Sequence, residues 1–209
     1  MGRYTEPRCR LCRKQGEKLF LKGEKCYNNC ILDKKVRQKP PGQHGLRRTK
    51  PSVYGIRLNE KQKARYLAGI TERQFRRLFE KAERMKGITG ENLLRLLELR
   101  LDNVVCRLGF GSSKVQARQL VLHRHVKVNG RTVNIPSYIL RPGDSVELGT
   151  KLRDNIFVQR ALEEASKKSL PSWLVYDAST FSGKVTKLPA REEISYPVNE
   201  QLIVELYSR

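Results

Sequence analysis

Apolar residues in the first half of the chain recur with the 3.6-residue period of amphipathic helices. The capping box Thr71-x-x-Gln74 opens the clearest of these stretches, and Gly87 can end it. Its apolar positions at helical spacing are Phe75, Leu78, Phe79, Ala82 and Met85. Asn59 can cap a shorter helix that runs to about Leu67. We interpret the two phenylalanines as core residues rather than as groups that stack on bases.

A second pair of helices is predicted farther along the chain. Residues 91–108 form a Leu-rich helical stretch with an interruption near Asp102, whose side chain can cap a new turn. After a turn that contains two glycines, Ser113-x-x-Gln116 is another capping box and opens a helix over residues 114–122. Two short helices joined by such a turn resemble a helix-turn-helix.

The apolar period then changes to two, which is the repeat of a β-strand. Residues 126–128 and 131–133 flank Asn129-Gly130, a pair that favours a type I′ hairpin, and another strand is predicted at 146–148. The C-terminal part begins with a helix over residues 155–167, and strand-like stretches follow at 173–176 and 184–188. Periodicity leaves residues 199–207 open between helix and strand. The pattern predicts an α+β fold.

The charge of the chain indicates a polyanionic partner. Among 209 residues there are 43 Lys and Arg against 21 Asp and Glu, a net charge of +22. Such an excess repels itself in a compact protein unless an anion neutralises it. The sequence has no apolar run long enough to span a membrane, no secretory signal and no myristoylation signal. Nucleic acid is therefore the predicted partner, and we expect no membrane association.

The first fifty residues form a basic arm. They contain 15 Lys and Arg and 4 Asp and Glu, a net of +11, whereas the remaining 159 residues supply the other +11. A basic block of this kind usually contacts phosphate, although it can also be a solubilising tail. Residues 39–51 are rich in Pro and Gly and are predicted to be extended. Arg47, Arg48 and Lys50 would there face phosphate or, alternatively, belong to a solvated hinge.

Four of the five cysteines lie in this arm as two close pairs, Cys9-x-x-Cys12 and Cys26-x-x-x-Cys30. Two such pairs separated by a short loop suit one tetrahedral Zn²⁺ bound by four thiolates. Because sulfur fills all four positions, the zinc site would be structural rather than catalytic. Disulfides, an iron–sulfur cluster and unliganded thiols remain as alternatives. Cys106 stands apart in an apolar stretch and is interpreted as a small buried hydrophobic residue.

The sequence between residues 100 and 148 resembles the RNA-binding module named for small-subunit ribosomal protein four. The resemblance lies in Arg100-Leu-Asp-Asn-Val-Val, Arg107-Leu-Gly-Phe-Gly, Ser113-Lys-x-x-Ala-Arg-Gln-Leu-Val, Val126-x-Val-Asn-Gly and Arg141-Pro-Gly-Asp. The module also occurs in other families, and the rest of the chain chooses among them. Pro41-Gly-Gln-His-Gly, Leu58-x-Glu-Lys-Gln-Lys, Glu72-Arg-Gln-Phe-Arg and the segment 198–209 resemble the bacterial ribosomal protein family itself, from end to end.

This resemblance implies a fold of three parts. They are a basic arm over residues 1–45, metal-bearing or metal-free in the family and here carrying the predicted four-cysteine zinc site, a mainly helical domain over 46–98 completed by 155–209, and an inserted RNA-binding module over 99–154. It also implies a cytoplasmic protein of the small ribosomal subunit that is neither an enzyme nor a homo-oligomer. Such a protein binds the five-helix junction in the 5′ domain of 16S rRNA early in assembly.

The resemblance further implies contact with ribosomal protein five, in a region tied to decoding accuracy. With proteins three and five, the family lines the channel through which mRNA enters the subunit, and Arg47 and Lys50 match that lining. Because the base edges of A-form RNA are hidden, proteins read such helices through phosphates and 2′-hydroxyls. The side chains that we expect to contact RNA are Arg3, Arg10, Arg13, Lys22, Arg47, Arg48, Lys50, Arg57, Lys61, Arg65, Arg73, Arg76, Arg77, Lys114, Arg118, His123, Arg124, Lys127 and Arg131.

Two other classes of function share some of these signals. The tripeptide Arg100-Leu101-Asp102 matches the one that carries the catalytic aspartate of pseudouridine synthases, but too few residues follow the module for a catalytic domain. Asp102 is better explained as a helix cap. A DNA-binding regulator would share the cysteine and helix-turn-helix signals but would prefer duplex DNA over structured RNA.

Overall fold

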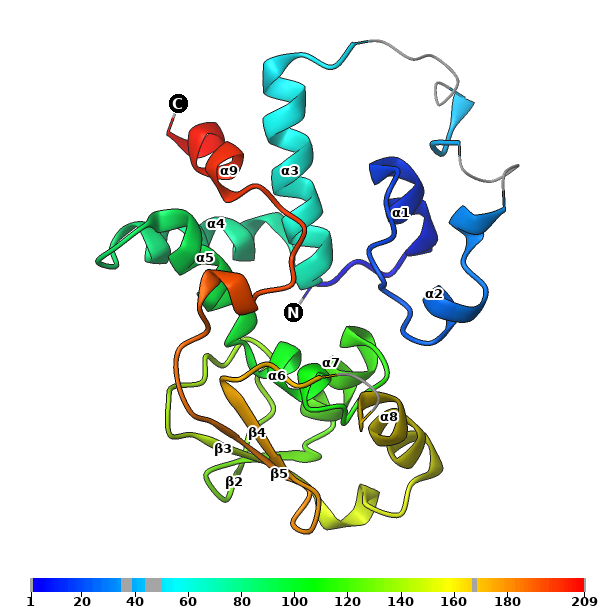
Figure 1. Ribbon diagram of the computed structural model, residues 1–209, viewed down its shortest axis with the longest axis vertical. Coiled ribbons are helices and arrows are strands. Elements are labelled where there is room, and N and C mark those ends of the chain that lie inside the picture. The colour runs from blue at the N-terminus through cyan, green and yellow to red at the C-terminus, as the bar shows by residue number, and fades with distance from the viewer. Residues whose placement is uncertain (1, 35–38, 44–49, 167–168, 209) are drawn as a thin grey trace. The chain divides into compact units, whose positions relative to one another are not determined.

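The computed structural model describes residues 2–34, 39–43, 50–166 and 169–208 (Figure 1). The chain divides into two compact units, one made of residues 1–93 with 196–209 and the other of residues 94–195. The division falls within a single helix, α5 (Thr89–Glu98). The first unit is helical and the second contains an antiparallel sheet, so the predicted α+β class is confirmed.

The first unit contains residues 9–34, here called the cysteine segment, and three longer helices. Besides the start of α5, its described elements are α1 (Cys9–Gln15), α2 (Lys25–Asn28), the 3₁₀ turn η1 (Ile31–Asp33), α3 (Val53–Ala68), α4 (Glu72–Glu83) and α9 (Glu200–Tyr207). The capping box predicted for α4 is present, with Thr71 and Gln74 in the two reciprocal roles. Phe75 and Phe79 are buried, as expected for core residues.

The cap predicted for the preceding helix is wrong. Helix α3 begins at Val53 rather than after Asn59, and Ser52 caps it by accepting a hydrogen bond from the Gly55 N–H at 3.1 Å. Ser52 has the extended backbone that an N-cap needs, whereas Asn59 lies inside the helix and is exposed. The helix is therefore longer than its apolar period indicates.

Residues 199–207, which periodicity left open, form helix α9 beside α3 (Figure 1). The Asn199 side chain accepts a hydrogen bond from the Gln201 N–H at 3.1 Å, and the Asn199 N–H donates to Glu60 on α3 at 3.1 Å. Ile203 is fully buried. The last segment is helical because a cap and a buried apolar residue fix it against a helix that is distant in sequence.

The second unit combines helices with one sheet. Its elements after α5 are α6 (Leu101–Arg107), α7 (Lys114–Leu122), β1 (Val126–Val128), β2 (Arg131–Thr132), β3 (Ser145–Leu148), η4 (Thr150–Leu152), α8 (Ile156–Ser166), β4 (Leu174–Asp177), β5 (Ser182–Val185) and η5 (Arg191–Glu193). Asn129 and Gly130 have φ of 50° and 77°, and β1 pairs with β2 across them. The predicted hairpin is confirmed, since a type I′ turn requires positive φ at both positions.

The sheet extends beyond the segment assigned to the RNA-binding module. Its strand order is β2-β1-β3-β5-β4 and every pairing is antiparallel. Strand β5 pairs with β3, with Val146 opposite Gly183. Residues 155–195 therefore belong to the second unit, whereas the sequence placed 155–209 with the helical domain. The added strands satisfy backbone groups that β3 would otherwise leave unpaired at an edge.

One apolar core lies between the helices and the sheet of the second unit. Its most buried members come from α6, α7 and four of the strands, with Trp173 preceding β4. Helices α6 and α7 pack against each other, as expected for the helix-turn-helix-like pair. This core holds α7 and the hairpin in place, and both carry residues that are expected to contact RNA.

Candidate nucleic-acid interface

The four arm cysteines lie on three neighbouring elements. Cys9 and Cys12 are on α1, Cys26 is on α2 and Cys30 immediately precedes η1. Burial raises the pKa of the Cys12 thiol, and the nearby Cys26, Cys9 and Cys30 act in the same direction. Burial likewise raises the pKa of Cys26, with further contributions from Cys30 and Cys9. The two pairs predicted from the spacing are thus close enough to perturb one another.

Backbone groups of the intervening loop point at two of these sulfur atoms. The Lys22 N–H donates to the Cys26 Sγ at 3.3 Å, and a backbone hydrogen bond from Leu19 lowers the pKa of Cys12 against the effect of burial. Donors placed in this way favour a thiolate over a thiol. Within residues 2–34, 39–43, 50–166 and 169–208, however, no three His, Cys, Asp or Glu side chains are arranged as a metal-binding group.

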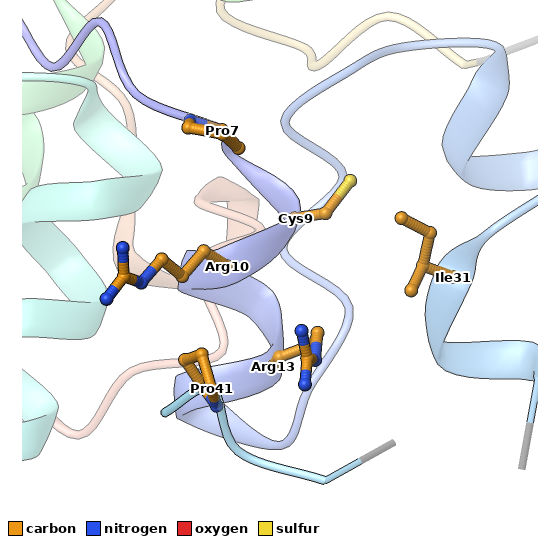
Figure 2. Close-up of a pocket in the computed structure, with 6 residues that line it drawn as sticks. All are labelled: Pro7, Cys9, Arg10, Arg13, Ile31 and Pro41. Atoms are coloured by element: carbon orange, nitrogen blue, oxygen red, sulfur yellow. The ribbon is translucent and has the colours of Figure 1, made fainter. Parts of the chain in front are cut away.

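A hollow of about 440 Å³ lies beside this cysteine segment (Figure 2). Its lining residues are Pro7, Cys9, Arg10, Arg13, Ile31 and Pro41. Figure 2 shows the Cys9 sulfur pointing toward Ile31. Arg13 Nε donates to the Lys39 carbonyl at 2.9 Å, while Arg10 and Glu6 form a long pair of 3.9 Å between exposed side chains. An exposed pair of this kind contributes little stability, so Arg10 can exchange it for a phosphate.

Three of the α3 cations expected to contact RNA pair instead with carboxylates of their own unit. Arg57 lies 2.5 Å from Glu205 on α9, and Lys61 lies 2.6 Å from Glu72 on α4. Arg65 approaches Glu72 at 3.8 Å. Lys61 is buried and also lies over the Tyr207 ring. These side chains join α3 to α4 and α9, which the sequence pattern could not distinguish from an RNA-facing stripe.

Helix α4 carries an exposed basic face. Arg73, Arg76 and Arg77 are all exposed, and Arg76 pairs with Glu80 one turn later at 3.3 Å. The apolar side of the helix is buried through Phe75, Phe79 and Ala82, so the arginines are turned toward solvent. A fixed row of cations on a helix surface can bind successive phosphates.

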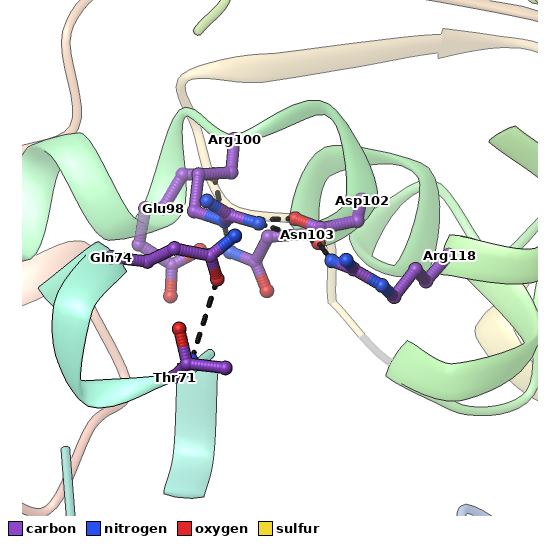
Figure 3. A network of polar contacts seen from close by, with 7 residues as sticks. All are labelled: Thr71, Gln74, Glu98, Arg100, Asp102, Asn103 and Arg118. Carbon is purple, nitrogen blue, oxygen red and sulfur yellow. Dashed lines mark hydrogen bonds and ion pairs between the residues drawn. The ribbon is translucent and has the colours of Figure 1, made fainter. Parts of the chain in front are cut away.

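Arg118 was expected to contact RNA, but its side chain is buried. It is 5% exposed, and its Nη1 lies 3.0 Å from the Asp102 carboxylate (Figure 3). Arg100 binds the same carboxylate through two hydrogen bonds of 3.1 and 2.8 Å. The expected role of Asp102 as a cap is wrong, because the N-cap of α6 is Arg100 and no side chain caps it. Asp102 instead pairs with two buried arginines.

A second polar cluster lies next to this one. Arg107 binds Glu98 through hydrogen bonds of 3.2 and 2.7 Å, and the Asn103 amide also donates to Glu98. Lys114, at the start of α7, is half-buried, and burial lowers its pKa to about 8 while Glu98 acts in the opposite direction. Asp102 acts on the pKa of Lys114 in the same direction as Glu98, whereas Arg107 acts in the direction of burial.

Sequence reasoning missed Arg100 and Arg107 as members of these clusters. The available signal was a set of charged residues inside the otherwise apolar stretch 91–108. Buried charges are paired, so their partners could have been sought in the same stretch.

The remaining module cations gather at the end of α7 and on the hairpin. His123, Arg124 and Arg131 are exposed, and Lys127 is half-buried on β1. Arg124 has a positive φ of 64°, which turns the chain sharply between α7 and β1. The His123 and His125 rings lie 6.2 Å apart beside a second hollow of about 200 Å³. This end of the unit therefore presents cations and imidazoles together.

The other expected contacts lie in the arm and the linker. Arg3, Lys22 and Lys50 are exposed. Arg47 and Arg48 fall outside the residues that the structure describes. No described helix has the length and apolar character needed to cross a bilayer.

Comparison with known proteins accounts for the whole chain. Residues 3–98 match the model of the ribosomal protein S4/S9 N-terminal domain, and residues 99–146 match that of the S4 domain. The chain is 56% identical over 210 residues to the small ribosomal subunit protein uS4 of Pelotomaculum thermopropionicum. It is 57% identical to that of Dictyoglomus turgidum and 54% identical to that of Geotalea daltonii. Each match covers 100% of both chains.

Proposed function

The chain belongs to the family of small ribosomal subunit protein uS4, and we propose that it holds the five-helix junction of the 16S 5′ domain. As a member of this family it is a structural, non-enzymatic protein of the cytoplasmic small subunit that binds rRNA. The family resemblance drawn from the sequence is thereby confirmed. A junction of this kind concentrates phosphate charge, so the protein stabilises it by placing cations where the strands converge. Early binding would nucleate assembly of the surrounding RNA.

The observation that carries this proposal is the separation of paired from exposed cations. Arg57, Lys61, Arg100 and Arg118 are bound to carboxylates within their own units. The exposed set, in which Arg10 and Arg76 make only solvent-exposed ion pairs, comprises Arg3, Arg10, Lys22, Lys50, Arg73, Arg76, Arg77, His123, Arg124 and Arg131. Most of the exposed cations stand on short rigid elements or tight turns, so little side-chain and backbone order must be gained on binding. We assign phosphate contact to this exposed set, with Arg13, Lys114 and Lys127 at its margin.

We further propose that one structural Zn²⁺ orders the arm. The donor set suits it by type, since four cysteines lie on or beside α1, α2 and η1, and two of them accept backbone N–H groups. Cys9, Cys12, Cys26 and Cys30 would hold the ion as thiolates. The metal supplies a cross-link between segments that have few apolar residues of their own.

The resemblance also supports two further contacts. Ribosomal proteins five and three are proposed as neighbours, and Arg47 and Lys50 are proposed to contact mRNA where it enters the subunit. Lys50 is exposed just before α3, in a Pro- and Gly-rich segment that can present its cations to a strand.

The salt dependence of RNA binding tests the proposed face. The full-length protein is titrated with a transcript of the 16S 5′ domain and with duplex DNA of equal length, at several salt concentrations. Arg73→Gln combined with Arg77→Gln should weaken binding and reduce the slope of log K against log salt by about 2. Arg160→Gln, an exposed arginine on α8, is the matched control. Equal affinity for the transcript and for DNA would contradict the proposal.

A further inference from the structure

Two aromatic side chains of the cysteine segment form an exposed stacked pair. The Phe20 and Tyr27 rings have centroids 4.9 Å apart and planes inclined by 29°. Phe20 is 47% exposed and Tyr27 is 54% exposed, although each covers part of the other. The phenylalanines of the other stacked pairs in the described chain, Phe75 and Phe79, are buried, and so is Phe110, which meets Tyr176 edge to face.

The backbone is strained in a way that turns Phe20 outward. Phe20 has a φ of 49°, a left-handed conformation that residues with a Cβ rarely adopt. Its neighbours Leu19 and Leu21 are both buried, at 3% and 6% exposure. The chain therefore keeps two leucines inside while it holds a large ring in water. Strain of this kind concentrates at ligand-binding positions.

Basic side chains flank the two rings. Lys22 follows Phe20 by two residues, Lys25 precedes Tyr27 by two, and both lysines are exposed. Glu24 is the acidic residue between them, and it accepts a hydrogen bond from the Asn28 amide at 3.3 Å. The pair also belongs to the basic arm of residues 1–50, which carries a net charge of +11. An aromatic surface bordered by ammonium groups is complementary to a nucleotide, which has an apolar base and an anionic phosphate.

We propose that Phe20 and Tyr27 form a stacking platform for one unpaired base of the bound RNA, with Lys22 and Lys25 on the adjacent phosphates. The platform rests on the proposed rRNA binding and adds an unpaired nucleotide to a surface otherwise expected to contact phosphate. Base–aromatic stacking tolerates any base because every base has a π face. RNA is favoured over a protein partner because of the charge around the rings.

The test uses the full-length, zinc-loaded protein and the 16S 5′-domain transcript. The double variant Phe20→Leu with Tyr27→Leu keeps apolar cover over the segment but removes both π faces. Tyr27→Phe keeps the stacking surface and serves as the conservative variant. Tyr138→Leu, which removes an aromatic ring that is 40% exposed in the second unit, is the matched control. Zinc content and circular dichroism of each variant establish that the segment has folded.

The double leucine variant should bind the transcript on the order of 10-fold more weakly. Its slope of log K against log salt should stay that of the wild type, because stacking releases no counterions, whereas Lys22→Gln should lower the slope by about 1. Tyr27→Phe and Tyr138→Leu should bind as the wild type does. Ultraviolet irradiation of the wild-type complex should cross-link RNA to the peptide that contains Phe20 or Tyr27.

Two outcomes distinguish a failure of the stacking platform from a failure of the proposed rRNA binding. If the wild type prefers the transcript but the folded double leucine variant binds it equally well and no cross-link reaches either ring, the platform is refuted. The pair would then be a cover for the cysteine loops or a contact for another protein. If the wild type shows no preference for the transcript over other RNA of equal length, the proposed rRNA function fails first.

Discussion

Asp102 is the residue on which the buried charge of the second unit depends. Its carboxylate lies 2.8 Å from Arg100 and 3.0 Å from Arg118, and the three side chains are 2–8% exposed. Two guanidinium groups share one carboxylate, so the cluster keeps an excess of positive charge inside the unit. A buried charge that loses its partner costs far more than an exposed one.

Asp102→Asn should therefore destabilise the protein by about 3–5 kcal/mol, because both arginines lose their counter-charge while remaining buried. Urea unfolding of the full chain measures the change. Asp154→Asn, at an exposed position, should change the free energy of unfolding by less than about 0.5 kcal/mol. A small effect at Asp102 would mean that water reaches the cluster.

The burial of protonated Lys114 lowers the free energy of unfolding of the protein. Burial lowers its pKa to about 8, below its ordinary value of 10.5. Below pH 8 both the folded and the unfolded chain are protonated at this position, and the cost is fully present. Between pH 8 and 10.5 the unfolded chain binds the proton and the folded chain does not, so this group makes stability rise with pH.

Lys114→Met should raise the free energy of unfolding at pH 7 by roughly 1 kcal/mol, once solvent screening of a half-buried group is allowed for. It should also remove the part of the stability rise between pH 8 and 10.5 that Lys114 causes. The difference between wild type and variant in urea unfolding, measured across that range, checks both. The same substitution should weaken binding to the rRNA transcript, so a variant with higher stability and unchanged affinity would exclude a role in RNA contact.

At the scale of elements, close packing rather than local pattern fixes how β5 meets α6. A Cβ placed on Gly183 would lie 2.3 Å from Leu108 Cδ2 and 2.5 Å from Cδ1. Leu108 is only 1% exposed, so its side chain has little room to move. Gly183 therefore sets how closely the strand approaches the end of the helix.

Gly183→Ala should destabilise the protein by about 1–3 kcal/mol through overpacking. Leu108→Ala should cost about 2–5 kcal/mol through the cavity that it leaves. The double variant should be more stable than the sum of the two effects allows, since the new methyl occupies part of that cavity. Thermal unfolding of all four proteins closes this cycle, and strict additivity would show that the two residues are not in contact.

Local signals predicted the elements best where the cap and the period agreed. Thr71 and Gln74 opened α4 as expected, and Asn129-Gly130 formed the hairpin turn, because both depend on hydrogen bonds or φ angles within a few residues. The start of α3 was missed because its first apolar residues, Val53, Tyr54 and Ile56, are exposed and do not mark a buried helix face. The pairing of β5 with β3 was missed because a strand's partner is set by residues far away in the sequence.

At the scale of the whole molecule, the proposed zinc would add a cross-link to an arm whose buried apolar side chains include Leu11, Leu19 and Leu21. Glu17 of this segment lies 2.6 Å from Lys63 on α3, so order in the arm also supports the first unit. Removing the proposed zinc with a chelator should expose residues 9–34 to protease while residues 94–195 stay resistant. Limited proteolysis with mass spectrometry measures this.

Cys9→Ser should reproduce the effect of the chelator, and Cys106→Ser, which changes the cysteine outside the segment, should not. A zinc content near one ion per wild-type chain is expected. An unchanged cleavage pattern after chelation would contradict the proposed structural ion.

The sequence by itself determined the α+β class, the family, the basic arm and the two cysteine pairs, because each is set by composition or by spacing within a short stretch. It could not decide which cations face RNA. Arg118 and Arg73 cannot be told apart in a helical pattern. In the tertiary structure, however, Arg118 is buried beside Asp102 and Arg73 is exposed. The physical reason is that a cation pairs with whichever carboxylate the fold brings near it. The carboxylate can be distant in the sequence: Asp102 is sixteen residues from Arg118, and Glu205 lies much farther from Arg57.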